Sequence, residues 1–267
     1  MLKKYWTLTP IEVISEAEMG RYIEPGNSFF IFHKIIVQYD NDKNVQDKKS
    51  ILVPFGQYTG GYNPRPGDKG YTKEDVFLDF FTFDEKYIQK FKEKERPYML
   101  RDIHVIARLA ISLPSNEKIF SDKDFFMVNN LASNGQPGYL KNYVEYIQKS
   151  INESAYKGMY KQVFSNNLSR LKKDTLFIPS DMENNMSEKD VEAKLNLFEN
   201  YSFYYRLISA SDLSIKILNS EKSFYYLLFI HSKPDKFIEI IDAASGDIIY
   251  SNLSTSKYIK QNDFKDL

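Results

Sequence analysis

Hydrophobic residues in the first quarter of the chain come in short, dense runs of the kind that form β-strands. Phe29–Asp40 and Ser50–Phe55 are rich in β-branched and aromatic side chains, which fit the pleated, half-buried surface of a sheet. The polar stretch 41–49 separates the two runs. We therefore predict a β-hairpin here.

The two apolar runs that follow are ambiguous. Val76–Phe83 fits either a buried strand or a short helix, since periodicity alone does not separate the two. The same holds for Ile103–Pro114. Between them, Asp84 stands in the N-cap position of a predicted helix that Pro97 ends.

Apolar residues in the middle of the chain repeat at the spacing of a helix face. One predicted helix has a stripe formed by Leu140, Val144, Ile147 and Ile151. A second predicted helix has a stripe formed by Tyr160, Val163, Phe164, Leu168 and Leu171. The pattern predicts that both stripes face a core.

A third predicted helix begins at Ser187, with Asp190 in the N3 position of a capping-box variant. Its stripe is Val191, Leu195 and Phe198. The polar stretch 179–187 immediately before it is the strongest candidate for a linker.

The C-terminal part returns to patterns typical of strands. The predicted strands lie within the segments 203–209, 213–218, 223–232 and 236–251. In the last segment, Asp242, Ser245 and Gly246 predict a hairpin turn, because Gly246 accepts the left-handed backbone conformation that closes a bulged hairpin.

Together these elements predict an α+β fold, with antiparallel sheet or sheets from the N- and C-terminal parts and a central helical group. The predicted parts are a β-rich region 1–135, a helical middle 136–202 and an antiparallel β region 203–267. The two β regions either share one sheet in a single domain 1–267 or form two lobes divided near residue 135.

The segment Phe224–Ser251 resembles the end of a PepSY-type module, whose last hairpin often carries an Asp-Ala-x-x-Gly-(Asp/Glu) turn. Asp242, Ala243, Gly246 and Asp247 match that turn. The resemblance covers about a tenth of the chain. It implies a role in protease inhibition or in binding at the cell envelope, and it transfers no catalytic residue.

Composition narrows the possible chemistry. The chain has 267 residues, 36 basic and 36 acidic residues and no cysteine, so disulfides, thiolate nucleophiles and cysteine-based metal sites are excluded. The start lacks the apolar run of a signal peptide, and no charge-free segment approaches the ~20 residues that span a bilayer. We expect a soluble protein without a membrane span that is cytoplasmic as written, or periplasmic or envelope-bound if a signal sequence has been removed.

Glycine is concentrated in one stretch, Gly56–Tyr71, which holds five of the eleven glycines of the chain. Its spacing departs from a phosphate-binding loop, which needs a lysine directly after its last glycine. The stretch instead carries Tyr58, Tyr62, Arg65 and Tyr71. Tyrosine gives flat apolar area with a hydroxyl at low entropy cost, and arginine gives a planar donor fork. These four residues are the predicted partner-binding site; the alternative is a surface loop packed on its own tyrosines.

Two other functions remain open. No nucleophile elbow, dinucleotide fingerprint or helical metal motif occurs, and no cofactor or metal is predicted. The first open function is that of a hydrolase or transferase, whose active site would bring His104 together with carboxylates in three dimensions. The segment Ser154–Lys173 holds five basic and no acidic residues, which is compatible with nucleic-acid binding. The absence of catalytic signatures favours a non-catalytic binding protein of the accessory, inhibitor or toxin-neutralising type, whose partner is another protein or a glycan.

Overall fold

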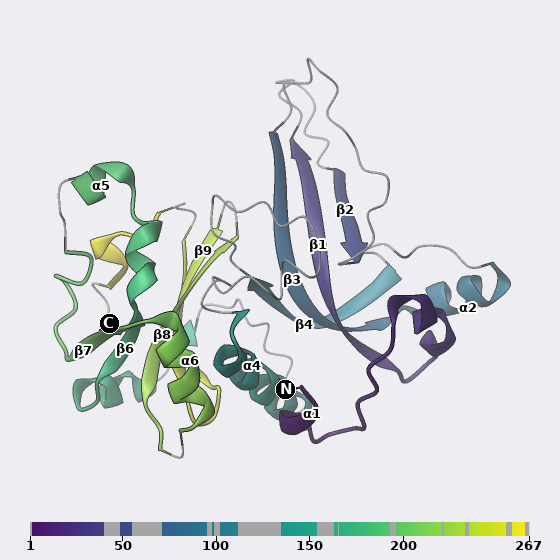
Figure 1. The fold of residues 1–267 in the computed structure, drawn as a ribbon, viewed down its shortest axis with the longest axis horizontal. Coiled ribbons are helices and arrows are strands. Elements are labelled where there is room, and N and C mark those ends of the chain that lie inside the picture. The colour runs from purple at the N-terminus through teal and green to yellow at the C-terminus, as the bar shows by residue number, and fades with distance from the viewer. Residues whose placement is uncertain are drawn as a thin grey trace. The chain divides into compact units, whose positions relative to one another are not determined.

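The chain divides into two units, one of residues 12–129 and one of residues 1–11 together with 130–267 (Figure 1). The structure is a computed structural model. It describes residues 2–39, 49–54, 71–94, 98, 102–111, 135–153, 163–164, 166–192, 196–220, 222–232, 235–254, 258–264 and 267. Helices and antiparallel or mixed sheets are both present, so the predicted α+β class is confirmed.

The unit of residues 12–129 is built on a four-stranded sheet of order β2-β1-β3-β4, in which all neighbouring strands are antiparallel. Its elements are the 3-10 helix η1 (Glu16–Tyr22), β1 (Ser28–Tyr39), β2 (Lys49–Pro54), β3 (Tyr71–Phe83), α2 (Glu85–Glu93) and β4 (Ile103–Ile111). The predicted hairpin is confirmed as β1 and β2. Both ambiguous runs are strands, because they lie in β3 and β4.

The ambiguity of β3 has a physical cause, since its described side chains at residues 78–81 are buried on both faces. On one face the ring of Phe81 stacks on Phe29 at 5.7 Å and meets Phe83 edge-on at 5.4 Å. On the other face Phe80 packs on Phe30 at 4.5 Å. A strand covered on both sides reads as a continuous apolar run without alternation, which is the pattern that this segment shows.

The chain leaves β3 through the predicted helix cap. The carboxylate of Asp84 accepts a hydrogen bond from the backbone N–H of Lys86 at 2.9 Å, which satisfies one of the free N–H groups at the start of α2. Tyr87 and Ile88 are buried, and the ring of Tyr87 stacks on Phe83 at 5.1 Å. Helix α2 is therefore held against the aromatic core of this unit.

The second unit is built on a six-stranded mixed sheet of order β5-β10-β9-β8-β6-β7. Strand β6 is parallel to β7 and β8, and the other pairs are antiparallel. Its strands are β5 (Val163–Phe164), β6 (Leu176–Pro179), β7 (Tyr205–Ile208), β8 (Tyr225–Ser232), β9 (Asp235–Asp242) and β10 (Ile248–Ser254). Its helices are α1 (Leu2–Tyr5), α4 (Pro137–Asn152), η4 (Asn166–Lys172), η5 (Ser180–Asn185), α5 (Glu188–Glu192), α6 (Ala210–Leu218) and η6 (Gln261–Phe264).

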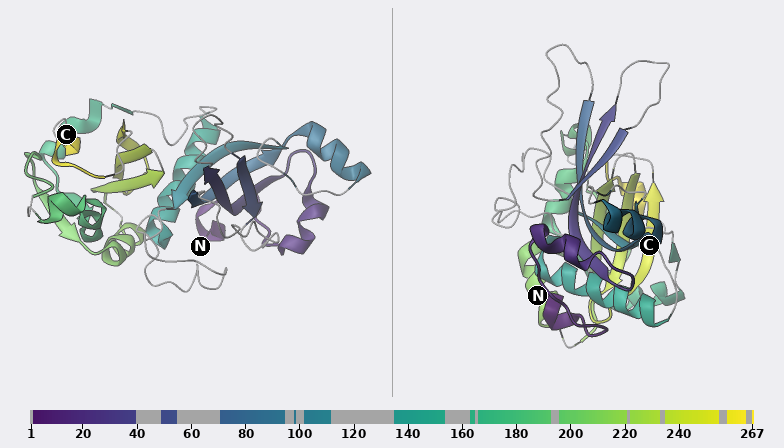
Figure 2. Two further views of the ribbon diagram at one scale, coloured as in Figure 1. Left: turned by 90° about the horizontal axis from the view of Figure 1, so that it is seen from above. Right: turned by 90° about the vertical axis from the view of Figure 1, so that its right-hand side faces the viewer.

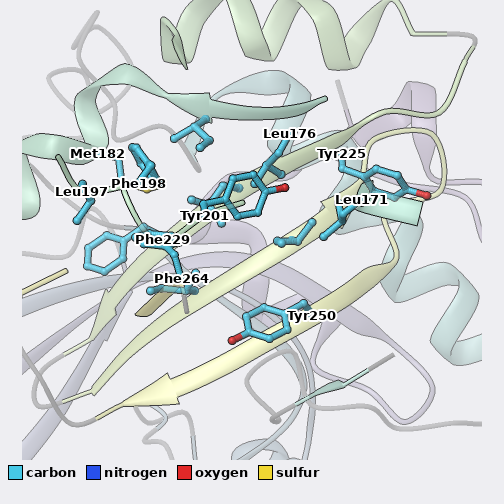
Figure 3. Packing of buried hydrophobic residues seen from close by; sticks show 14 of the residues in the cluster. Leu171, Leu176, Met182, Leu197, Phe198, Tyr201, Tyr225, Phe229, Tyr250 and Phe264 are labelled. Carbon is cyan, nitrogen blue, oxygen red and sulfur yellow. The ribbon is translucent and has the colours of Figure 1, made fainter. Parts of the chain in front are cut away.

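Both faces of this sheet are covered. On one face lies an aromatic and aliphatic cluster that includes Leu176, Phe198, Tyr250 and Phe264, all buried (Figure 3). On the other face the ring of Tyr139 in α4 meets Tyr226 of β8 edge-on at 5.3 Å. Helix α6 lies beside α4 (Figures 1 and 2).

The contact between α4 and α6 depends on a glycine. The N–H of Gly138 donates to the hydroxyl of Ser214 at 2.9 Å. A Cβ at residue 138 would lie 2.3 Å from the backbone oxygen of Ser214. Glycine therefore permits the close approach of the two helices.

The first predicted helix of the middle region is confirmed as α4. Val144 and Ile147 are buried as the stripe requires, but Ile151 at the end of the helix is 38% exposed. The third predicted helix is confirmed only as the short α5. Ser187 caps it, since its hydroxyl accepts the N–H of Asp190 at 3.2 Å, but Val191 is 55% exposed.

The second predicted helix is wrong over its described part. Val163 and Phe164 form the short strand β5, with Phe164 opposite Tyr250 in β10. The chain then forms the 3-10 helix η4, which still buries Leu171. Pairing with the sheet edge outweighs the helical spacing of the apolar residues, and Asn166 and Asn167 are weak helix formers.

Two further predictions are wrong for local reasons. Segment 213–218 is helix α6 and not a strand. The hydroxyl of Ser209 accepts the N–H of Asp212 at 3.1 Å and so caps this helix. The predicted linker 179–187 is part of the unit, because Pro179 ends β6 and Met182 is buried in the core.

The turn between β9 and β10 is confirmed. Gly246 has φ +71°, and the carboxylate of Asp242 accepts the N–H of Ala244 at 2.9 Å. The pairing of β10 with β9 shifts between Ile248 and Tyr250, which is the predicted bulge. This turn chemistry is sufficient to make the hairpin, so the PepSY-type resemblance stays a prediction.

Candidate binding surface

The predicted binding residues Tyr58, Tyr62 and Arg65 lie outside the described residues. The two ends of their segment are described. Pro54 closes β2 opposite His33, and Tyr71 opens β3 opposite Tyr39.

These two ends lie on opposite sides of β1, because β1 pairs with β2 on one side and with β3 on the other. They are also six positions apart along β1, from residue 33 to residue 39. At about 3.3 Å per residue this is on the order of 20 Å. Pro54 and Tyr71 are therefore two well-separated points on the same sheet.

The same unit has a surface hollow between η1 and α2, with a volume of about 360 Å³. Its lining includes the apolar Ile23 and Phe91. The two basic residues of the lining, Arg21 and Lys92, are balanced by two acids, Glu24 and Glu93. The hollow therefore has no net preference for an anion or a cation.

In the second unit, the face of the sheet under α4 contains a buried carboxyl group. Glu239 of β9 is fully buried, and its Oε1 accepts a hydrogen bond from the hydroxyl of Ser251 at 3.2 Å. Its Oε2 has no hydrogen-bond partner among the described residues. Burial raises the pKa of Glu239 to about 8, although the Ser251 hydrogen bond opposes this shift.

Polar groups of α4 lie near this carboxyl. The side-chain amide of Asn142 is 3.2 Å from the hydroxyl of Tyr226. With its oxygen toward that hydroxyl, its nitrogen reaches the backbone oxygen of Ala243 at 3.1 Å. Burial and, to a smaller extent, the nearby Glu239 together raise the pKa of Tyr146 to about 12. Asn142, Tyr226 and Glu239 are all buried, so among the described residues this cluster is part of the core.

A second buried charge lies on the other face of β9. Lys236 is 1% exposed, and its ammonium group donates to the backbone oxygen of Tyr258 at 2.7 Å and to the carboxylate of Asp263. This ion pair ties the C-terminal segment to the sheet. Sequence reasoning missed both Lys236 and Glu239; the available signal was a charged residue at an inward position of an otherwise apolar strand.

The structure places His104 in β4, where it is exposed and opposite Thr82. The surface hollow described above contains no histidine. Within the described ranges, no group of three or more His, Asp or Glu residues could hold a metal ion. In the same ranges no helix is long and apolar enough to cross a bilayer.

The basic segment 154–173 is not a regular α-helix where it is described. Residues 163–164 form β5 and residues 166–172 form η4. The side chains of Arg170, Lys172 and Lys173 are exposed, and the ammonium group of Lys172 lies 5.9 Å from the ring centre of Phe203. The continuous basic helix behind the nucleic-acid hypothesis is therefore absent from the described part.

Comparison of the chain with protein-family models, with curated proteins and with solved structures finds no match.

Proposed function

We propose that the protein is a non-catalytic binding protein that recognises another protein through the connection between β2 and β3. Tyr58, Tyr62, Arg65 and Tyr71 are its contact residues. The observation that supports this proposal is that the residues at the two ends of the connection, Pro54 and Tyr71, belong to strands on either side of β1.

The scaffold supports this role. The strands that flank the connection belong to a sheet whose core includes the packed rings of Phe29, Phe81 and Phe83. Binding residues are often placed on loops that a rigid scaffold positions. Tyrosine and arginine are also the residue types most enriched among the side chains that dominate binding energy.

The test is to replace Tyr58, Tyr62 and Arg65 together by alanine in the full chain. A partner is first captured from a lysate of the source cells, identified by mass spectrometry and purified. Its affinity for the wild type and the variant is then measured by calorimetry. Each hot-spot residue contributes about 2 kcal/mol or more, so we expect at least about a thirtyfold loss of affinity with an unchanged melting temperature.

The matched control is Val191→Ala, because Val191 is 55% exposed and belongs to the other unit. We expect this variant to keep full affinity for the captured partner. Unchanged binding by the triple variant, or loss of binding by the control alone, would show that the proposal is wrong. A glycan that competes with the captured protein would identify the ligand as a carbohydrate instead.

A further inference from the structure

We infer that the outer edge of β7 is a separate binding surface, which takes an extended segment of another protein as an added β-strand. In that segment, acidic side chains alternate with apolar ones. This surface lies in the unit of residues 1–11 and 130–267 and does not depend on the proposed function of the other unit.

Among the described residues, no strand pairs with the outer side of β7. Strand β7 is the last strand of its sheet among the described residues. It is parallel to β6, and the N–H of Leu176 donates to the carbonyl oxygen of Tyr204 at 3.0 Å. In a regular parallel ladder that starts with this bond, the backbone groups of Arg206 point toward β6, and those of Tyr205 and Leu207 point outward. The outward groups can pair with an incoming strand.

The side chains along this edge are also exposed. Tyr205 is 36% exposed, Leu207 is 43% exposed and the preceding Tyr204 is 78% exposed. Large apolar side chains concentrated on an unpaired edge are typical of surfaces that bind another chain. An added strand would cover them while its backbone pairs with β7.

The two faces of β7 set the chemistry of the incoming segment. Tyr205 lies on the apolar side, where its ring is 5.3 Å from Phe198. Arg206 is opposite Phe177 in β6, and the ammonium group of Lys216 lies 4.8 Å from the ring centre of Phe177. The other side of the edge is therefore basic. An added strand binds most favourably when its apolar residues lie beside Tyr205 and Leu207 and its carboxylates lie beside Arg206.

A second copy of the chain is a poorer occupant. When β7 pairs antiparallel with its own copy about a two-fold axis at residue 206, in the register that joins Tyr205 to Leu207, Arg206 directly faces Arg206 of that copy. Like charges directly opposite each other destabilise a sheet. The charge pattern therefore favours an acidic partner strand over self-association.

The test uses the isotope-labelled full chain and two blocked peptides, Val-Glu-Val-Glu-Val-Glu-Val and its Lys counterpart. Each is added at about 1 mM, which detects binding free energies of about 4 kcal/mol or more. We expect the Glu peptide to shift the amide NMR signals of Tyr205 and Leu207, and the Lys peptide to leave them in place. Equal shifts with both peptides, or none with either, would overturn the inference.

Two variants sharpen the test. Leu207→Pro removes an outward N–H, and proline is tolerated at such edge positions. We expect it to weaken binding of the Glu peptide by up to about tenfold. Arg206→Glu should reverse the preference between the two peptides. If Leu207→Pro does not fold, Arg206→Glu decides alone, and an unchanged preference overturns the inference. A dimer of the full chain that Leu207→Pro dissolves would also overturn it, because the occupant would then be a second copy.

Discussion

The buried carboxyl of Glu239 makes the stability of its unit depend on pH, and Glu239→Gln should remove that dependence. Glutamine keeps the shape of the side chain and can still accept the hydrogen bond that Ser251 donates at 3.2 Å. It differs in having no charge to bury. The substitution therefore isolates the cost of ionising a side chain that is fully buried.

The size of the effect follows from the pKa. Burial raises the pKa of Glu239 from 4.5 to about 8, so the folded state holds the proton more tightly than the unfolded state. The resulting stability is fully present below pH 4.5 and is lost as the pH rises to about 8. Each pH unit in this window costs about 1 kcal/mol. Between pH 5 and pH 8 the wild type should lose roughly 3 kcal/mol that the glutamine variant keeps.

The single tryptophan provides the assay, because Trp6 is buried and belongs to the same unit as Glu239. Urea unfolding followed by Trp6 fluorescence at pH 5, 6, 7 and 8 gives the free energy of unfolding of each protein. We expect the advantage of Glu239→Gln to grow steadily with pH. The control Glu199→Gln changes an exposed carboxylate of the same unit and should give a constant difference. A constant difference for Glu239→Gln would refute the reasoning.

Two other substitutions test packing. Asp263→Ala leaves the buried Lys236 without its carboxylate partner, so it should lower the free energy of unfolding by about 3–5 kcal/mol in the same urea assay. Adding Lys236→Met to this variant should recover much of the lost stability. An Asp263→Ala protein as stable as the wild type would contradict the role of the ion pair. Gly246→Ala combines a φ of +71° with a Cβ only 2.5 Å from the backbone oxygen of Asn142, so it should cost more than the roughly 1–2 kcal/mol of left-handed backbone alone. Gly26→Ala provides the comparison, because it has φ +87° and no atom within 4 Å of the new Cβ; equal losses of melting temperature in the two glycine variants would argue against the clash.

Local chemistry explains which elements could be predicted from sequence. The cap at Asp84 and the turn at Gly246 each depend on hydrogen bonds that close within a few residues. Neighbouring residues alone decide such bonds, so the sequence pattern is sufficient. The same holds for α4, a 16-residue helix whose apolar spacing continues from Leu140 to Ile151.

The wrong prediction for segment 213–218 has a different cause, which is that two periodicities fit the same short segment. In 213–218 the order Leu-Ser-Ile-Lys-Ile-Leu alternates as a strand would, and it also places Leu213 and Ile217 one helical turn apart. The structure uses the second option, since Leu213 and Ile217 are buried and Ile215 is 56% exposed. The deciding contribution is the cap at Ser209 together with the contact of α6 with α4.

Strand order, which no local pattern encodes, decides the role of β7 and of Glu239. The segments 205–208 and 237–241 both read as strands with one charged residue among apolar ones. Strand β9 lies between β8 and β10 and beneath α4. The carboxyl group of Glu239 is therefore buried, and its pKa rises. Strand β7 lies at the edge, so its Arg206 stays in water and can select a partner by charge. The same sequence pattern therefore forms a pH-dependent part of the core in β9, which has a neighbouring strand on each side. It forms a binding edge in β7, which has a neighbouring strand on one side among the described residues.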